Sequence, residues 1–102
     1  MKILTILFNI NLLNQLPIIY ENADKDKIQI LKENKNLAGI YLWIHKESGK
    51  TYLGSAVDLS KRITQYFSIK YLNQNKTMRI CNALTYYGYS VFSLTILEYI
   101  NI

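Results

Sequence analysis

Residues 39–55, GIYLWIHKESGKTYLGS, determine the fold that the sequence predicts. Apolar residues alternate with other residues from Ile40 to His45, which is the periodicity of a β-strand. The stretch from Lys46 to Lys50 contains turn-forming residues, and Thr51 to Ser55 can form a second short strand. The stretch therefore predicts a β-hairpin that carries one tripeptide with glycine and tyrosine on each strand, residues 39–41 and 52–54.

The pattern changes from strand to helix after the hairpin. Asp58 is a good N-cap residue, and the apolar residues Leu59, Ile63 and Phe67 recur every four positions, which predicts a helix with one buried stripe. Arg62 and Tyr66 are also four residues apart and lie on a neighbouring face of that helix.

A second helix and a third strand are predicted in the last part of the chain. Residues 77–87 have helical periodicity, and Gly88 is a typical helix stop. From residue 92 to residue 96, apolar residues alternate again, and Glu98 falls on the same parity. We therefore expect an α/β domain of the α+β type, with a small, mainly antiparallel three-stranded sheet and two helices packed on it.

The first part of the chain lacks such regularity. We predict that residues 1–38 are a lead-in segment, partly disordered, and that residues 39–102 form the domain. The apolar run from Ile3 to Phe8 is followed by polar residues, so no stretch reaches the ~20 apolar residues of a membrane span. A secretory signal stays open as an alternative, although no small-residue cleavage site follows.

Positive charge is concentrated in one region. The chain has 12 Lys and Arg against 7 Asp and Glu, a net charge of +5. Residues 58–79 contain Lys61, Arg62, Lys70, Lys76 and Arg79 against Asp58 alone. This distribution favours an anionic partner such as a phosphate backbone, and the alternative is an ordinary solvated helix face.

The two tripeptides, the arginine-bearing helix and the late glutamate, in this order, resemble the GIY-YIG nuclease family. The resemblance covers residues 39–100 and implies hydrolysis of phosphodiester bonds in double-stranded DNA. It implies that Tyr41 takes a proton from the attacking water and that Tyr52 adjusts its hydrogen bonding. A free tyrosine has a pKa of about 10, so this role needs nearby positive charge. By the same resemblance, Arg62 holds the scissile phosphate and Tyr66 donates a hydrogen bond to it.

Glu98 is the residue that the resemblance identifies as a metal ligand. A carboxylate, waters and a phosphate oxygen suit one hard divalent cation, Mg²⁺ or another such as Mn²⁺. The alternative is that Glu98 lies just beyond the sheet and simply faces water. The residues that we expect to contact DNA are Gly54, Ser55, Lys61, Lys70, Lys76 and Arg79.

The chain departs from the family pattern at two points. Asn75 lies near the place where some family members have a histidine, which leaves an auxiliary acid unassigned. The family domain continues beyond the glutamate strand with a helix that carries an asparagine, and we expect that helix to be missing after Ile102. His45 is expected at the hairpin without a catalytic role, and Cys81 is expected to be a packing residue.

The sequence thus predicts a DNA endonuclease of homing type, encoded in an intron and located in the mitochondrion. The location follows from the abundance of residues with A- or T-rich codons and from the resemblance to intron-encoded fungal relatives. One alternative is an inactive remnant that binds DNA weakly, and another is a small interaction domain. The target site and the oligomeric state are not predicted.

Overall fold

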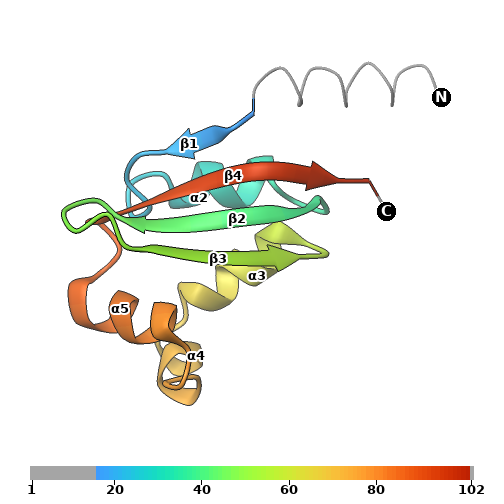
Figure 1. The fold of residues 1–102 in the computed structure, drawn as a ribbon. Coiled ribbons are helices and arrows are strands. Elements are labelled where there is room, and N and C mark those ends of the chain that lie inside the picture. Colours follow the sequence, from blue (N-terminus) through green and yellow to red (C-terminus); the bar gives the residue numbers. More distant parts are fainter. Residues whose placement is uncertain (1–15, 102) are drawn as a thin grey trace, which may run out of the picture.

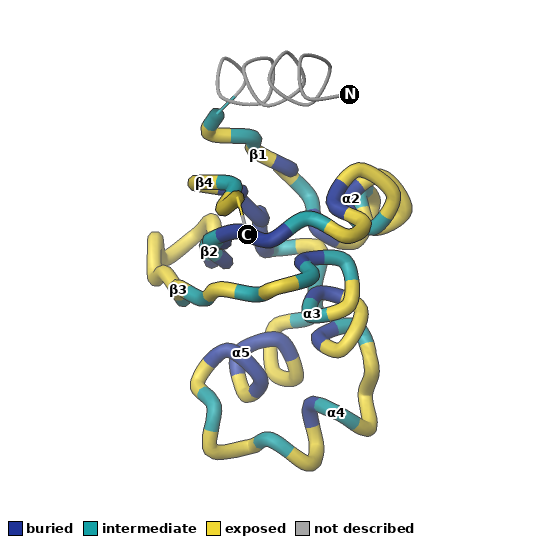
Figure 2. The backbone as a smooth tube through the Cα atoms, turned by 90° about the vertical axis from the view of Figure 1, so that its right-hand side faces the viewer, coloured by how far each residue is buried: buried dark blue, intermediate teal, exposed yellow. Residues whose placement is uncertain are grey.

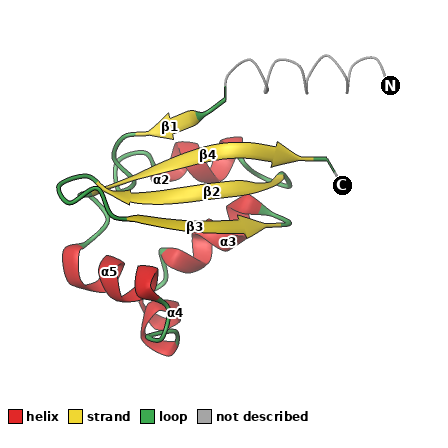
Figure 3. Ribbon diagram, viewed as in Figure 1, coloured by secondary structure: helices red, strands yellow, loops and turns green. Residues whose placement is uncertain are grey.

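The computed structural model describes residues 16–101 and contains a four-stranded sheet with helices packed against it (Figure 1, Figure 3). The strand order is β1-β4-β2-β3, and all neighbouring strands are antiparallel. None of the helices within this range is both long and apolar enough to cross a lipid bilayer. In chain order the elements are β1 (Ile18–Tyr20), α2 (Lys27–Glu33), β2 (Ala38–His45), β3 (Thr51–Ala56), α3 (Leu59–Tyr66), α4 (Ile69–Gln74), α5 (Arg79–Tyr87) and β4 (Phe92–Ile100).

The mixed fold class and the predicted hairpin are confirmed. Strands β2 and β3 pair continuously from Gly39 opposite Ala56 to Ile44 opposite Thr51. The turn between them contains Gly49 at φ 75°, a left-handed conformation that glycine adopts without steric cost. The hairpin therefore fixes the two glycine and tyrosine tripeptides on adjacent strands.

Within residues 16–101, the helices cover one face of the sheet, and we call the other face the open face, although Ser93 and Thr95 on it are buried. Figure 2 shows the sheet nearly edge-on, with α2 and α3 on one side of it. Tyr41 and Trp43 of β2 point to the covered face, whereas Leu53 of β3 is 71% exposed on the other face. The covered face forms the core together with the helices, through Tyr20, Ile30, Tyr41, Trp43, Leu59, Ile63, Tyr66, Leu72, Ile80, Leu84, Phe92, Leu94 and Ile96.

The prediction of three strands and two helices was wrong in number. Within the described residues there are four strands, and α2 and α4 join the two expected helices. Strand β1 pairs with β4, with Ile18 opposite Ile96 and Tyr20 opposite Leu94. A three-residue strand shows no periodicity, and its partner lies at the other end of the chain. Helix α4 has only six residues, which is less than two turns.

A buried hydrogen-bond network connects α2 to both β1 and β4. The hydroxyl of Tyr20 donates to a carboxylate oxygen of Glu33 at 2.8 Å, and the amide of Asn34 donates to the oxygen of Tyr20 at 3.1 Å. The hydroxyl of Tyr99 donates to the amide oxygen of Asn34 at 2.7 Å. We call Tyr20, Glu33, Asn34 and Tyr99 the structural cluster. Through it, residues 18–34 are bonded to the last strand.

A β-bulge in β4 changes the face on which Glu98 lies. Glu98 is opposite Ile40, but Ile96 is opposite Tyr41, so Leu97 is an extra residue between the two pairs. Residues directly opposite each other share a face, and consecutive residues of a strand face opposite sides. Glu98 therefore lies on the open face. The prediction that it shares the parity of the apolar residues of β4 was wrong, because a bulge leaves no trace in the alternation.

Helix α3 begins as predicted. The carboxylate of Asp58 accepts a hydrogen bond from the backbone N–H of Lys61 at 3.2 Å, which caps the helix. Ile63 is fully buried, as expected for the apolar stripe. The helix ends at Tyr66, whose ring is buried, whereas Phe67 lies at the C-cap and is partly buried.

Helix α5 also matches the prediction closely. It begins two residues later than expected and ends at Gly88, which has φ 80°. Cys81 is fully buried, which confirms its packing role, and burial raises the pKa of its thiol. Tyr87 has the helical spacing of the buried residues Ile80 and Leu84, but its side chain is 51% exposed.

Candidate active site

Two tyrosines from different elements meet beneath the sheet. The hydroxyl oxygens of Tyr41 on β2 and Tyr66 on α3 are 2.8 Å apart, so one donates a hydrogen bond to the other. Their rings meet edge to face, with centroids 6.0 Å apart. Both residues are 2% exposed. The pair is therefore rigidly held in the core.

Arg62 brings a positive charge to this pair. It lies on α3 one turn before Tyr66 and is half-buried. Burial lowers the pKa of Arg62, but the interactions of its guanidinium with the phenol oxygens of Tyr41, Tyr66 and Tyr71 outweigh this effect and raise the pKa above its ordinary value. We call Tyr41, Arg62 and Tyr66 the arginine cluster. The sequence predicted each of its members.

Within the hydrogen-bonded pair, Tyr66 is the residue that retains its proton. Burial raises the pKa of Tyr66 well above that of a free tyrosine, and the hydrogen bond and charge interaction with Tyr41 raise it further. Tyr71 acts in the same direction, and Arg62 opposes it. Tyr66 is thus the partner of Tyr41 that stays protonated and can donate the hydrogen bond between the two phenol oxygens.

The absence of a side chain at Gly54 leaves room for the ring of Tyr41. Gly54 is directly opposite Tyr41 in the hairpin, and a Cβ atom at Gly54 would collide with the phenol carbon and oxygen of Tyr41. A glycine in a strand is typical of a close approach, for example by a substrate or a packed helix. The approaching group is instead the phenol of Tyr41, so the glycine of the second tripeptide makes room for the tyrosine of the first.

Gly39 is needed for a different reason. A Cβ atom at Gly39 would lie 2.5 Å from the backbone carbonyl oxygen of Glu98 and 2.9 Å from Cδ1 of Leu59. The first distance is far shorter than any normal contact. The glycine of the first tripeptide thus lets β4 approach β2 next to the bulge and lets α3 pack below.

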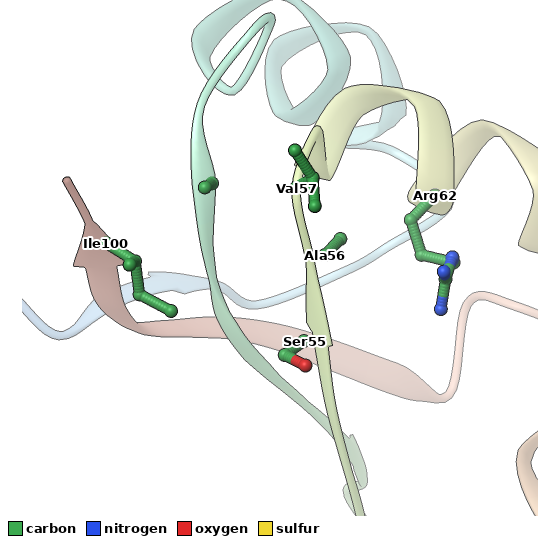
Figure 4. A pocket seen from close by; sticks show the side chains of 6 residues that line it. Ser55, Ala56, Val57, Arg62 and Ile100 are labelled. Carbon is green, nitrogen blue, oxygen red and sulfur yellow. The ribbon is translucent and has the colours of Figure 1, made fainter. Parts of the chain in front are cut away.

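A pocket of about 330 Å³ lies beside Arg62. Figure 4 shows Arg62 extending from α3, with Ser55 and Ala56 on β3, Val57 just after that strand and Ile100 on β4. The structure therefore brings together two of the predicted site residues, Ser55 and Arg62, at the edge strand β3. This concave surface is open enough to admit a phosphate group.

Two predicted catalytic residues are not part of the arginine cluster. Tyr52 is opposite Trp43, and its ring contacts Phe92 at 6.4 Å between centroids. Glu98 is exposed on the open face, in one row with Ile40 and Ser55. Because neighbouring strands are about 4.8 Å apart, Glu98 and Ser55 are separated by about 10 Å.

The remaining predicted DNA contacts are all on the surface. The four cationic side chains are exposed, and they come from α3, α4, the segment between α4 and α5, and the first residue of α5: Lys61, Lys70, Lys76 and Arg79. These helices follow one another in space, since α3 contacts α4 and α4 contacts α5. The basic residues are thus distributed along α3, α4 and α5, and Arg62 lies on the first of these helices.

Among the predicted site residues, Glu98 is the one carboxylate that could bind a metal ion. No group of three His, Cys, Asp or Glu side chains gathers anywhere in residues 16–101. Glu98 is an exposed carboxylate, and Mg²⁺ is often held by one or two carboxylates with waters and substrate phosphates. Glu98 can hold such an ion only if substrate and water supply most of the ligands.

Two further polar residues, His45 and Asn75, form hydrogen bonds within their own segments. The imidazole Nδ1 of His45 is 2.6 Å from the hydroxyl of Ser48, and His45 is 5% exposed, so it stabilises the hairpin turn. The amide of Asn75 donates to the backbone carbonyl of Tyr71 at 2.8 Å, and Asn75 is the C-cap of α4.

Tyr71 is a residue near the arginine cluster that the sequence did not predict. Its ring lies 5.9 Å from that of Tyr66. It follows the end of α3, so it shares no helical spacing with Arg62.

Comparison with known proteins gives one match. The family model described as "GIY-YIG catalytic domain" matches residues 37–101, well over half of the chain. Neither the curated proteins nor the solved structures contain a significant match. The matched range begins just before β2 and ends just after β4, and it includes both tripeptides and the arginine cluster.

Proposed function

The chain belongs to the GIY-YIG family and is a nuclease of that type, and on this premise we propose that the arginine cluster hydrolyses phosphodiester bonds of double-stranded DNA. The observation that carries this proposal is the position of the Tyr41 hydroxyl. It shares a hydrogen bond of 2.8 Å with Tyr66, which stays protonated, and it interacts with the guanidinium of Arg62. That arrangement favours negative charge on the Tyr41 oxygen.

The roles of the three residues follow from this arrangement. Tyr41, as the phenolate, accepts a proton from the attacking water, while Tyr66 donates a hydrogen bond to the same phenol oxygen. Arg62 binds the non-bridging oxygens of the phosphate in the pocket beside β3 and stabilises the charge that grows on them. The new bond joins the water oxygen to phosphorus, and the bond from phosphorus to the leaving sugar oxygen breaks. Water protonates that oxygen.

Glu98 is the residue that would hold Mg²⁺ or another divalent cation such as Mn²⁺. A bound cation would supply further charge stabilisation on the phosphate. Ser55 and the exposed basic residues of the helices would contact the DNA backbone on either side of the pocket. These contacts carry no sequence information, so binding should be salt-sensitive and nearly independent of sequence.

Nicking of a supercoiled plasmid tests the function. We expect nicked product with Mg²⁺, loss of nicking with a chelator, and recovery when Mg²⁺ is restored. Glu98→Gln should need a higher Mg²⁺ concentration than the wild type, whereas Glu21→Gln, an exposed acid next to β1, should not. Nicking that persists in chelator would exclude the metal, and no nicking by a folded sample would exclude the function.

One observation favours a second candidate, a remnant that binds DNA without cutting it. Glu98 lies on the open face, whereas Tyr41 points to the covered face. In that case the folded protein would bind duplex DNA at low salt, with a salt-dependent Kd, and would leave the plasmid supercoiled at every Mg²⁺ concentration.

We also propose a homing-type enzyme that is encoded in an intron and acts in the mitochondrion. The codon bias implied by the composition and the resemblance to intron-encoded fungal relatives support this proposal. Sequencing the surrounding gene tests it. We expect the reading frame to lie inside an organellar intron and the enzyme to cut the intron-free allele near the insertion site. A nuclear gene without an intron would contradict the proposal.

A further inference from the structure

We propose that Tyr71 is a further substrate-contacting residue, whose phenol hydrogen is donated to a non-bridging oxygen of the phosphate that Arg62 holds. This inference rests on the proposed function and extends the site from β2 and α3 to α4. Neither of the two tripeptides nor the spacing around Arg62 points to this residue.

The ring of Tyr71 is fixed against the arginine cluster. It packs edge to face on Tyr66, with centroids 5.9 Å apart and ring planes at 83°. Its backbone is held at both ends, because its N–H donates to the hydroxyl of Ser68 at 3.2 Å and its carbonyl accepts from the amide of Asn75 at 2.8 Å. The phenol is therefore pre-positioned. Its contact with Tyr66 places the ring next to the residue that follows Arg62 by one helical turn on α3.

The hydroxyl of Tyr71 is available to a ligand. The side chain is partly exposed, and its hydrogen-bond partner in the described residues is the thioether sulfur of Met78 at 4.0 Å. A thioether is a weak acceptor, whereas a phosphate oxygen is a charged and strong one. Exchanging the first for the second costs little and gains a charge-assisted hydrogen bond.

The other tyrosines near the helices do not share these properties. The hydroxyl of Tyr89 donates to the backbone carbonyl of Tyr66 at 2.6 Å, which is a strong internal bond. Tyr86 on α5 is 82% exposed and contacts only the ring of Tyr87 among the aromatic residues described. Tyr71 alone combines a poor internal partner with a ring packed on the arginine cluster through Tyr66, and Tyr86 is a suitable control.

Tyr71→Phe removes the hydroxyl and keeps the ring, so the experiment compares it with Tyr86→Phe. We expect the single-turnover cleavage rate of Tyr71→Phe to fall about tenfold or more, by analogy with other transition-state donors. The Kd for a short duplex, measured by anisotropy in chelator, should rise about three- to tenfold, as for the loss of one hydrogen bond to a charged group. The melting temperature should stay within about 2 °C, and Tyr86→Phe should change none of these values.

The two readouts separate this proposal from the proposed function. If the wild type cleaves DNA and Tyr71→Phe cleaves equally fast with an unchanged Kd, the role of Tyr71 is overturned and the nuclease assignment remains. If the wild type does not cleave DNA, the proposed function fails, and the Kd alone decides: an unchanged Kd overturns the role of Tyr71, and a raised Kd supports it. A large drop in melting temperature without a matching change in Kd would also overturn it, because the hydroxyl would then be structural.

Discussion

The two tyrosine clusters of this molecule differ in the charge that lies beside them. In the structural cluster, Tyr20 bonds to the carboxylate of Glu33 and Tyr99 bonds to the buried amide of Asn34. In the arginine cluster, the charged neighbour of Tyr41 is the guanidinium of Arg62. The same side chain is thus placed once beside a negative charge and once beside a positive charge.

This difference determines what each phenol can do. Burial, together with the charge of Glu33, raises the pKa of Tyr99 to about 12 and that of Tyr20 also well above its usual value. These phenols remain protonated donors, which suits a structural role. A guanidinium instead favours a phenolate, which can accept a proton. Burial raises the pKa of Tyr20, Tyr99 and also Tyr66, so the feature that distinguishes the two clusters is the sign of the neighbouring charge.

The largest expected effect comes from removing the positive charge. Arg62→Ala should lower the single-turnover cleavage rate by about 100- to 1,000-fold, because it removes the group that binds the phosphate and favours the Tyr41 phenolate. The free energy of unfolding should change by less than about 1 kcal/mol, since the side chain is only half-buried. Lys35→Ala, an exposed cation between α2 and β2, is the control and should change neither quantity. Wild-type cleavage by Arg62→Ala would remove this residue from the site.

The second effect concerns stability rather than activity. Asn34→Ala should lower the free energy of unfolding by about 2 kcal/mol, because the hydroxyl of Tyr99 loses its buried acceptor. The cleavage rate of the folded fraction should not change. Urea unfolding measures the first quantity, and Asn73→Ala, an exposed residue of α4, should shift it by no more than about 0.5 kcal/mol. Equal stability of both variants would show that the structural cluster does not stabilise the fold.

The smallest effect is a pH dependence at the alkaline end. The pKa of Tyr99 is about 12 in the folded state and about 10 in an unfolded chain, so the folded state holds this proton more tightly. Its contribution to stability is complete below pH 10 and is lost as the pH rises from about 10 to about 12. Unfolding curves between pH 9 and pH 11 should show this loss, and Tyr99→Phe should make it shallower. Identical slopes in the two proteins would contradict the assignment.

The sequence predicted the parts of the fold that depend on local signals. The hairpin follows from alternation and a glycine turn, α3 follows from the Asp58 cap, and α5 ends at Gly88. The members of the arginine cluster were instead predicted from the resemblance to the family, and the spacing alone gave only that Arg62 and Tyr66 lie one helical turn apart. Local periodicity is sufficient for these elements because each buries one continuous face.

The parts that the sequence did not predict depend on long-range pairing. Strand β1 pairs with the edge of β4, and a bulge in β4, opposite Ile40 and Tyr41, turns Glu98 to the open face. The contact between Gly54 on β3 and the ring of Tyr41 on β2 depends on the pairing of the two strands, so neither tripeptide alone predicts it. Alternation tells which residues share a face only while the register is unbroken.

The central claim is that the hydroxyl of Tyr41, and not that of Tyr20, takes part in chemistry. The most direct test is the single-turnover cleavage rate of Tyr41→Phe and Tyr20→Phe, which remove the same oxygen from the two clusters. Both variants should lose about 1 kcal/mol of unfolding free energy, because each leaves a buried hydrogen-bond partner unpaired. We expect Tyr41→Phe to cleave DNA at least about 100-fold more slowly than the wild type and Tyr20→Phe to cleave it at the wild-type rate. Equal cleavage rates for the two variants would contradict the account.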